Sequence, residues 1–486
     1  MRLQELLLDV AVKELHADPM TEITSVVYDS RKSEPGALFV AISGFTSDGN
    51  RFIPMAVEKG AAVVVTAKRP ETDVPYVLVE SDRLALAMIG CNFYGRPAEH
   101  MTMIGITGTN GKTSSTLLLK AVLEKTLGAR VGLIGTMENR IGQETIPTER
   151  TTPESLELQK LFARMRDAGC THVVMEVSSH AIILERIGGI RYDVAAFTNL
   201  TEDHLDFHKT MDAYCDAKAE LFRRYGRAMI NMDDSYAERI RENAACPVLE
   251  TSVLRPAGLY ARDVDYEADG ISFTAVCGEE RAEVAVPIPG RFTVYNALTV
   301  LGIAKSLGIS LKAAAGALRD AEGVRGRIEV VPTPGMPYTV LVDYAHTPDG
   351  LENVLRSVRD FCKGRLISVF GCGGDRDPMK RPIMGEIGVK NADFAIITSD
   401  NPRTEVPMAI IRDILAGVKE EYGAYTVVED RRAAIRYAMD IAKKDDIIVL
   451  AGKGHETYQE INGVKYHLDE REEVRAHLSE LRNCNG

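Results

Sequence analysis

The chain lacks any apolar run of the roughly 18 residues that a bilayer-spanning helix needs. Its first residues carry acidic side chains inside the apolar stretch and offer no small-residue cleavage site, which is unlike a signal peptide. Basic residues are outnumbered, because 58 Lys and Arg face 70 Asp and Glu, and the net charge is −12. This balance disfavours broad contact with nucleic-acid phosphates. We therefore expect a soluble cytoplasmic protein with no nucleic-acid partner and no membrane insertion.

The eight cysteines include no Cys-x-x-Cys pair. Their scattered spacing argues against a zinc ribbon and against a disulfide framework. We expect most of them to be buried, small apolar residues in a reducing compartment. No period of about 20 to 50 residues recurs, which argues against solenoids and propellers.

The length of 486 residues predicts about three domains at roughly 150 residues each. Two stretches are typical of domain joints: residues 95–100, which begin Gly-Arg-Pro, and residues 331–337, which hold three prolines. We expect a small N-terminal α/β domain over 1–97, a central domain over 98–331 and a C-terminal domain over 332–486.

Short apolar runs alternate with helical patterns in the central and C-terminal segments. In the central segment the spacing predicts strands at 103–107, 173–177, 194–198 and 228–231, and a helix over 113–127. Residues 258–287 predict an antiparallel hairpin around Asp269-Gly270. The C-terminal segment predicts strands at 339–342, 366–370, 394–398 and 447–450, with helices over 408–418 and 431–442. The predicted class is α/β, with a mainly parallel P-loop sheet and then a Rossmann-like doubly wound sheet.

The N-terminal segment carries its own short β-branched runs, at 25–28, 38–41 and 62–66. These runs predict strands, because β-branched side chains favour extended backbone. A small α/β domain is the expected result.

The strongest local signal is the stretch 107–114, which reads TGTNGKTS and stands between a predicted strand and a predicted helix. Glycines let the backbone N–H groups wrap a polyphosphate, and the helix N-terminus adds positive potential. Lys112 is placed to reach the β- and γ-phosphates, and the Thr113 hydroxyl to bind Mg²⁺. The strict Walker spacing is not met, because Ile106 stands where the first glycine would. The alternative is an ordinary glycine-rich turn.

Polar side chains follow two further predicted strands. Glu176 ends the first of these strands, and residues 199–206, which include His204, follow the second. Mg²⁺ prefers oxygen ligands, and the carboxyl ends of parallel strands face the usual ligand crevice. The alternatives are a surface charge at Glu176 and a hydrogen-bonded structural histidine at His204.

Motifs in all three segments resemble the Mur ligase family. These are TGTNGKT at 107–113, EVSSH at 176–180, TNLTEDHLD at 198–206, YNA at 295–297, GRIE at 326–329 and DYAH at 343–346. The resemblance implies an ATP-dependent amide ligase of peptidoglycan precursor synthesis, which serves the cell wall, cell shape and cell division. Members that add meso-diaminopimelate are similar also at 29–31 (DSR), 151–153 (TTP), 371–381, 400–403 (DNPR) and 452–456 (GKGHE). The implied substrates are UDP-N-acetylmuramoyl-L-alanyl-D-glutamate and meso-diaminopimelate.

The resemblance also assigns roles to residues. ATP would contact Gly108, Thr109, Asn110, Gly111, Lys112, Thr113, Ser114, Asn296, Arg327 and Asp343. The metal, Mg²⁺, would be bound by Thr113, Glu176, His204 and Lys218, and the catalytic set is Lys112, Glu176, His204 and Lys218. The UDP-sugar dipeptide would contact Ser30, Thr151, Thr152, Ser178 and Arg186. Diaminopimelate would contact Arg381, Asp400, Asn401, Pro402, Arg403, Gly452 and Glu456.

At Lys218 the resemblance and the residue pattern predict different roles, and at Leu184 the sequence differs from the family. Lys218 by itself reads as a solvated helix lysine, whereas the resemblance implies a carbamate formed with CO₂, whose oxygen could serve a second Mg²⁺. Leu184 departs from the family, because some relatives carry a polar residue there that contacts the sugar-peptide. The sequence does not decide the oligomeric state, and we expect a monomer.

The expected chemistry is phosphoryl transfer to a carboxylate, followed by attack of an amine on the acyl phosphate. Such transfer depends on positioning and charge neutralisation, and the chain shows no Gly-x-Ser-x-Gly elbow for a nucleophilic mechanism. Arg381 and Arg403 suit a substrate rich in carboxylates, although residues 400–403 alone would read as a proline turn with a surface arginine. His204 and His346 are both candidates for accepting the amine proton. The alternatives are a folylpolyglutamate synthase and a nucleotide-binding regulatory module that does not catalyse.

Overall fold

The computed structural model describes residues 1–44, 48–71, 73–148, 150–223 and 226–484. The chain forms two compact units, one of Met1–Tyr260 with Leu298–Ala314 and one of Ala261–Ala297 with Ala315–Gly486. Every helix in the described part of the chain is too short or too polar to span a membrane. Cys91, Cys170, Cys215 and Cys372 are buried free thiols, as expected, and Cys246, Cys277 and Cys362 are half-buried free thiols.

The first unit begins with a small five-stranded sheet in the order β1-β5-β4-β3-β2. Its strands are β1 (Val12–His16), β2 (Ser25–Val27), β3 (Ala37–Ala41), β4 (Val63–Thr66) and β5 (Tyr76–Val79). Its helices are α1 (Leu3–Leu6), α2 (Ile53–Glu58) and α3 (Asp82–Phe93). The three predicted strands are confirmed. Strand β1, which pairs antiparallel with β5, is mostly exposed and carries no apolar pattern that would have revealed it.

The larger sheet of the first unit has the order β13-β12-β11-β6-β10-β7-β8-β9, and the strands from β13 to β7 are parallel. The strands are β6 (Thr102–Thr107), β7 (Val131–Ile134), β8 (Asn139–Ile141), β9 (Glu144–Ile146), β10 (His172–Glu176), β11 (Val194–Phe197), β12 (Arg227–Asn231) and β13 (Val248–Ser252). The helices are α4 (Lys112–Leu127), α5 (Ser155–Asp167), α6 (Ser179–Ile183), α7 (Leu205–His208), α8 (Met211–Ala219) and α9 (Ala237–Asn243). Because β6, β10 and β11 are parallel neighbours, the polar residues that follow them meet at one sheet edge.

Three strands and two helices follow in the chain: β14 (Leu259–Glu267), β15 (Gly270–Cys277), β16 (Glu280–Val286), α10 (Arg291–Ser306) and α11 (Leu311–Leu318). A turn at residues 268–269 separates β14 from β15, one residue earlier than the turn predicted at Asp269-Gly270. Strand β16 pairs antiparallel with β15 along its full length.

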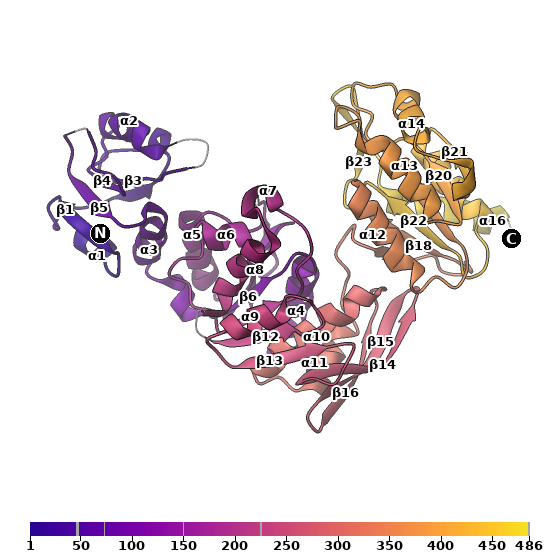
Figure 1. The fold of residues 1–486 in the computed structure, drawn as a ribbon, viewed down its shortest axis with the longest axis horizontal. Coiled ribbons are helices and arrows are strands. Elements are labelled where there is room, and N and C mark those ends of the chain that lie inside the picture. The colour runs from indigo at the N-terminus through magenta and orange to yellow at the C-terminus, as the bar shows by residue number, and fades with distance from the viewer. Residues whose placement is uncertain (45–47, 72, 149, 224–225, 485–486) are drawn as a thin grey trace. The chain divides into compact units, whose positions relative to one another are not determined.

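The second unit contains a six-stranded sheet in the order β17-β18-β22-β19-β20-β21. Its strands are β17 (Glu329–Val331), β18 (Thr339–Asp343), β19 (Leu366–Phe370), β20 (Phe394–Ile397), β21 (Ala424–Val427) and β22 (Ile447–Ala451), with a separate hairpin of β23 (Tyr458–Ile461) and β24 (Val464–His467). Its helices are α12 (Pro348–Arg359), α13 (Lys380–Lys390), α14 (Pro407–Leu415), α15 (Arg431–Ile441) and α16 (Glu470–Cys484). Most of these elements are labelled in Figure 1.

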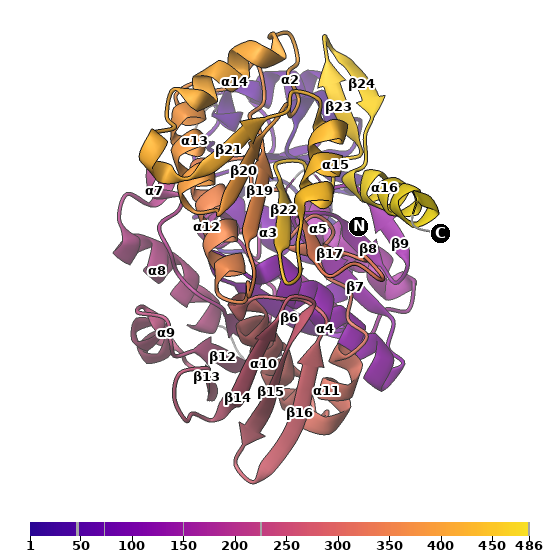
Figure 2. The same ribbon diagram turned by 90° about the vertical axis from the view of Figure 1, so that its right-hand side faces the viewer.

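Helices cover both faces of this second sheet, as expected of a doubly wound fold. Helices α12, α13 and α14 pack with Leu341, Phe370 and Val449 on one face. Helices α15 and α16 pack with Val340, Val369 and Leu450 on the other, which gives the strands two apolar faces. Figure 2 shows α12 and α15 on either side of the strands.

Candidate active site

The phosphate loop is held in shape by the residues that follow β11. Gly108 has φ +150° and Gly111 has φ +84°, and a Cβ at Gly108 would lie 1.9 Å from Thr198 Oγ1. The Thr198 hydroxyl donates to the carbonyl of Asn110 at 2.6 Å, and the Asn110 N–H donates to Asn199 Oδ1 at 2.9 Å. The loop is therefore preformed, and its glycines are required where the backbone is most crowded.

Lys112, the first residue of α4, folds back over the loop. Its ammonium donates to the carbonyls of Gly108 at 2.9 Å and Thr109 at 2.8 Å. Burial lowers the pKa of Lys112, because the charged form is poorly solvated there. A polyphosphate would give this ammonium the anionic partner that the two carbonyls do not supply.

Glu176 is buried at the end of β10, with 1% of its surface exposed. Its Oε1 accepts from the Thr113 hydroxyl at 3.0 Å and from the Thr136 N–H at 2.9 Å, and its Oε2 accepts from the Thr136 hydroxyl at 2.9 Å. A Cβ at Gly135 would lie 2.5 Å from Oε1, so only glycine fits beside it. The alternative of a surface charge at Glu176 is therefore wrong.

Lys218 on α8 is buried, with 1% exposure. Its Nζ donates to the same carbonyl of Gly108 at 2.9 Å and lies 4.5 Å from the centre of the Tyr214 ring. Burial, followed by the nearby charge of Lys112, lowers the pKa of Lys218 well below its usual value. The solvated lysine that the helix pattern indicated is thus wrong, because the side chain is buried beside the phosphate loop, where its charged form is disfavoured.

His204 lies at the start of α7 and its side chain is 47% exposed. Its backbone has φ +55°, its Nε2 lies 3.4 Å from Asp203 Oδ2, and its ring packs edge-on against His180. Within the described residues, no group of three or more His, Cys, Asp or Glu side chains is gathered closely enough to hold a metal ion. Of the four expected metal ligands, the structure brings Thr113 and Glu176 into direct contact.

Four expected substrate residues gather next to Glu176. The Thr152 hydroxyl donates to the Glu176 carbonyl at 2.8 Å and accepts from the Ser178 N–H at 3.2 Å. Arg186 donates to the Thr152 carbonyl at 3.2 Å, and the Thr151 hydroxyl contacts that of Thr136 at 3.0 Å. Leu184 is buried, in keeping with its apolar side chain.

Three arginines surround Glu154, and we call Arg83, Arg150 and Arg186 the arginine cluster. Their nitrogens lie 3.7, 3.7 and 3.3 Å from the single oxygen Oε2 of Glu154. Arg83 Nη1 and Arg186 Nε are buried without a hydrogen-bond partner among the described residues. Three positive charges thus meet one negative charge, which leaves the cluster ready for an anion.

A cavity of about 500 Å³ adjoins this cluster. Arg83 and Arg150 line it together with Ser30, whose side chain is buried against Met55. Arg31 lines it too, but its guanidinium is already paired with Asp29 at 2.8 Å. The structure therefore places Ser30 in a cavity that is also lined by Arg83 and Arg150, which share the one carboxylate of Glu154.

In the second unit, the two arginines expected to bind the substrate, Arg381 and Arg403, differ in which of their guanidinium nitrogens have partners within the protein. Arg381 is buried, and its terminal nitrogens contact Glu405 at 2.7 and 2.9 Å and Asp413 at 2.8 Å. Arg403 has φ +52° and donates to the Gly374 carbonyl at 2.7 Å and to Glu460 at 3.3 Å. No described residue pairs with Arg403 Nη2, whereas both terminal nitrogens of Arg381 are used within the protein.

Asp400 and Asn401 are buried after β20 and the Arg403 side chain is only 20% exposed, so the alternative of a proline turn with a surface arginine is wrong. Asp400 Oδ1 accepts from the Asn401 N–H at 2.7 Å, while its buried Oδ2 has no hydrogen-bond partner among the described residues. A Cβ at Gly452, where φ is +122°, would lie 2.5 Å from that Oδ2. Asn401 and Glu456 are joined by a hydrogen bond of 2.9 Å.

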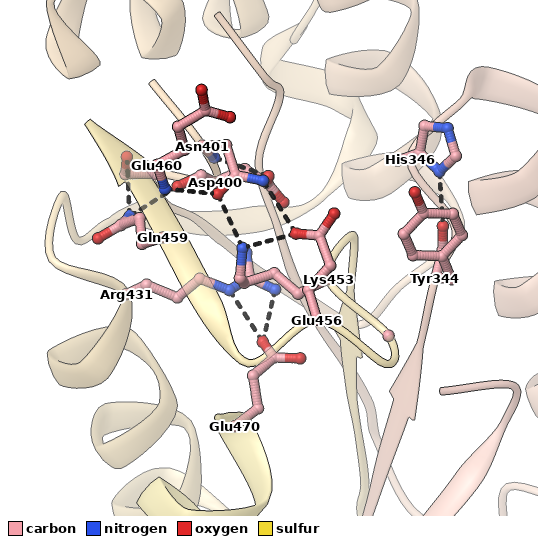
Figure 3. Close-up of polar contacts among 12 residues, drawn as sticks. Tyr344, His346, Asp400, Asn401, Arg431, Lys453, Glu456, Gln459, Glu460 and Glu470 are labelled. Atoms are coloured by element: carbon pink, nitrogen blue, oxygen red, sulfur yellow. Dashed lines mark hydrogen bonds and ion pairs between the residues drawn. The ribbon is translucent and has the colours of Figure 1, made fainter. Parts of the chain in front are cut away.

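A fully buried ion pair lies beneath these loops (Figure 3). Arg431 contacts Glu470 Oε1 through Nε at 2.9 Å and through Nη2 at 2.7 Å, and Nη2 also donates to the Ala451 carbonyl at 2.8 Å. Arg431 is the first residue of α15 and Glu470 the first of α16, so the pair ties two helix starts to the end of β22.

Asp343, at the end of β18, is buried and accepts from the N–H groups of Ile328 and Ala345, each at 2.8 Å. Burial raises the pKa of Asp343. The Arg327 guanidinium lies 5.7 Å from the centre of the Tyr344 ring, and His346 Nδ1 lies 2.8 Å from the Tyr344 carbonyl. Asn296 is buried on α10. Asp343 therefore fixes the turn that presents Arg327.

Three family models match the chain: the Mur ligase family catalytic domain over residues 22–94, the Mur ligase middle domain over 106–304, and the Mur ligase glutamate ligase domain over 326–454. A relative from Clostridium botulinum is 48% identical over 466 residues, which is 95% of this chain and 96% of the relative. It is named UDP-N-acetylmuramoyl-L-alanyl-D-glutamate--2,6-diaminopimelate ligase. The chain belongs to the Mur ligase family. Mur ligases are ATP-dependent, and this chain is accordingly an ATP-dependent ligase.

Solved structures support the three-domain fold of this family. One of a UDP-N-acetylmuramoyl-L-alanyl-D-glutamate--2,6-diaminopimelate ligase has a TM-score of 0.81 and 32% identity, and the match covers 99% of both chains. A folylpolyglutamate synthase from Mycobacterium tuberculosis, complexed with ADP, has a TM-score of 0.58 and 18% identity over 76% of this chain and 91% of its own. That second likeness shows the fold alone. The domain limits expected at 97 and 331 stay predictions.

Several residues of the site carried no signal in the sequence. Thr136 holds Glu176 from a segment 40 residues away, and Arg83 reaches Glu154 from a distant segment. Lys453 stands inside the GKGHE motif, yet only the structure shows that its side chain is buried. Motif position could have singled out Lys453, whereas the others depend on tertiary contacts.

Proposed function

We propose that this Mur ligase joins diaminopimelate to the D-glutamate γ-carboxylate of UDP-N-acetylmuramoyl-L-alanyl-D-glutamate and consumes ATP. The observation that carries this proposal is the full-length likeness to relatives named for that reaction, at 48% identity over 95% of the chain. Such a reaction belongs to cytoplasmic peptidoglycan precursor synthesis, on which cell shape and division depend. We expect the ligase to act as a monomer.

The phosphate loop supplies the ATP end of the reaction. Its backbone N–H groups and the start of α4 favour an anionic polyphosphate, and the Lys112 ammonium exchanges its two carbonyl partners for phosphate oxygens. The Thr113 hydroxyl and the Glu176 carboxylate are hard oxygen ligands in direct contact, which fits Mg²⁺. When bound, Mg²⁺ neutralises phosphate charge, and His204 and Lys218 complete the ligand set that we propose.

Lys218 is proposed to carry a carbamate. A neutral amine adds to the carbon of CO₂ and then loses a proton, so the lowered pKa of Lys218 favours the reaction. The product replaces a buried cation beside Lys112 with an anion, which removes the repulsion between the two lysines. Its oxygens would then serve a second Mg²⁺.

The UDP-sugar dipeptide is proposed to bind along the first unit. Ser30 and the arginine cluster would hold its anionic groups, because two of the three arginines in the cluster have no carboxylate of their own. Thr151, Thr152, Ser178 and Arg186 would hold the peptide end close to Glu176.

Diaminopimelate is proposed to bind in the second unit. The free Nη2 of Arg403 suits a carboxylate, and Glu456 and the free Oδ2 of Asp400 suit an ammonium. We assign Arg381 the role of holding Glu405 and the loop at Gly373, rather than of touching the substrate. Asn296, Arg327 and Asp343 are proposed to serve the nucleotide.

The chemistry proceeds in two transfers. The γ-carboxylate oxygen attacks the γ-phosphorus of ATP, ADP leaves, and an acyl phosphate forms. The neutral amine of diaminopimelate then attacks the acyl carbon, loses a proton and expels inorganic phosphate. His204 and His346 are the two candidates for accepting that proton.

The test combines purified protein, Mg²⁺, ATP and the UDP-muramoyl dipeptide with diaminopimelate or L-lysine. We expect phosphate release and an amide-linked nucleotide tripeptide only when both the dipeptide and an amino acid are present, with a preference for diaminopimelate of roughly 10⁴-fold. ATP binding without any amide product would favour a regulatory module instead. Comparable kcat/KM values for the two amino acids would show that the assignment of residues 400–403 is wrong.

A further inference from the structure

Lys453 is a lysine whose side chain is buried completely. It follows β22, its exposed fraction is 0%, and its Nζ donates to Asn401 Oδ1 and to Glu456 Oε2, each at 3.0 Å (Figure 3). A buried ammonium is costly unless a carboxylate and hydrogen bonds compensate it. Lys453 therefore depends on both partners, and both partners depend on Lys453.

The orientation of the Asn401 amide follows from its donors. Its oxygen accepts from the Lys453 ammonium and from the N–H of Glu460 at 2.9 Å, so its Nδ2 must face Glu456, to which it donates at 2.9 Å. The side chain of Asn401 thus connects the end of the β20 loop with Lys453, Glu456 and Glu460, which lie in one stretch of the chain. Its oxygen is already occupied within the protein and is not available to a substrate.

The two carboxylate oxygens of Glu456 differ in their hydrogen bonds. Its Oε2 accepts from both Lys453 and Asn401, whereas no described residue donates to its Oε1. One carboxylate oxygen is therefore committed to the protein and the other remains open. The two hydrogen bonds hold the carboxylate in one orientation, which is the pre-organisation that a specific binding site needs.

We propose that Lys453 is a positioning residue for the amino-acid substrate. It fixes Glu456 so that Oε1 meets a substrate ammonium, and it holds the Asn401 amide in one orientation. This inference rests on the proposed function, because diaminopimelate supplies the ammonium. Lys453 does not touch the substrate, so its effect should be confined to the affinity for the amino acid. A lysine that served folding alone would affect all three substrates equally.

The first experiment is Lys453→Met, which keeps an unbranched side chain one atom shorter and removes its charge. We expect KM for diaminopimelate to rise about 30-fold, while KM for ATP and for the UDP-muramoyl dipeptide stays within about twofold. Lys465→Met is the matched control, since Lys465 lies over the same Tyr458 ring at 4.1 Å but is exposed on β24. Lys453→Arg, which can still donate to both partners, should recover part of the loss. An unchanged KM for diaminopimelate in Lys453→Met would overturn the proposal.

A second variant covers the case in which Lys453→Met does not fold. Lys453→Met/Glu456→Gln removes both charges and leaves no unpaired buried carboxylate. If Lys453 acts through Glu456, this double variant should have the same KM for diaminopimelate as Glu456→Gln alone, within about twofold. Additive losses would show that Lys453 acts elsewhere. Absence of amide product from the unsubstituted protein would instead refute the proposed function, so the two failures are distinguishable.

Discussion

The phosphate-loop region of the first unit and the amino-acid region of the second unit both bury lysine, but they neutralise it differently. Lys112 and Lys218 both donate to the carbonyl of Gly108, Lys112 donates also to that of Thr109, and neither forms an ion pair with a described carboxylate. Lys453 is instead paired with Glu456, and the nearby Arg431 with Glu470. The first region keeps positive charge for ligands to neutralise, whereas the second neutralises itself and can discriminate through fixed geometry.

The largest expected effect is on the unpaired cation of the phosphate loop. Lys112→Met should lower kcat by about 10³-fold, because phosphoryl transfer relies on charge neutralisation by groups that are already in place. Lys120→Met is the matched control on the same helix, since Lys120 is also buried but is paired with Glu124 at 2.6 Å. Steady-state phosphate release measures both variants. An unchanged kcat in Lys112→Met would show that the phosphate-loop region does not use this positive charge for catalysis.

The next effect concerns the charge of Lys218. Lys218→Ala should lose about 100-fold in kcat, and the unsubstituted ligase should lose activity when CO₂ and bicarbonate are removed. Lys218→Arg distinguishes a role as a cation from a role as a carbamate, because arginine keeps a cation but forms no carbamate. We expect Lys218→Arg to be as impaired as Lys218→Ala. Full activity in Lys218→Ala, together with activity that does not depend on bicarbonate, would refute the carbamate.

In the second region the expected loss is one of discrimination rather than of rate. Arg403→Met should lower the preference for diaminopimelate over L-lysine by about 100-fold, because the distal carboxylate would lose its only proposed guanidinium partner. The measurement is the ratio of kcat/KM values for the two amino acids. Arg412→Met, on the exposed side of α14, is the control. An unchanged ratio would place the selective contact elsewhere.

How far the sequence anticipates these two regions depends on whether a feature is local. The loop at 107–114 and the helix that follows were predicted within one residue, because apolar spacing and glycines are local signals. The burial of Glu176 and Lys218 was not predictable, since the groups that surround them come from Thr136 and Gly108, far away in the chain. The Arg431–Glu470 pair lies outside every motif. The motifs thus predicted where the site lies, whereas which of its charged groups are buried or paired could be learned only from the structure.

A smaller effect is expected at the arginine cluster. Arg83→Gln should raise KM for the UDP-muramoyl dipeptide about tenfold, because the substrate anion would lose one of the cluster's uncompensated cations. Arg31→Gln is the control in the same cavity, since Arg31 is exposed and already paired with Asp29. KM for ATP should stay constant in both variants. Equal effects of the two substitutions would mean that the cavity responds to net charge alone.

The smallest effect is on stability, and it contrasts the two regions directly. Because the pKa of Lys218 is lowered in the folded protein, the unfolded chain binds the proton more tightly, and the lysine destabilises the fold wherever the unfolded chain keeps that proton. The penalty is full below the folded pKa and disappears as pH rises to the usual value of lysine. In buffer free of bicarbonate, Lys218→Met should therefore raise the unfolding temperature by about 2 °C at neutral pH, with a smaller gain at alkaline pH. Lys453→Met should lower it instead, because it leaves Glu456 without its cation. Calorimetry across this pH range would contradict the contrast if both substitutions moved stability in the same direction.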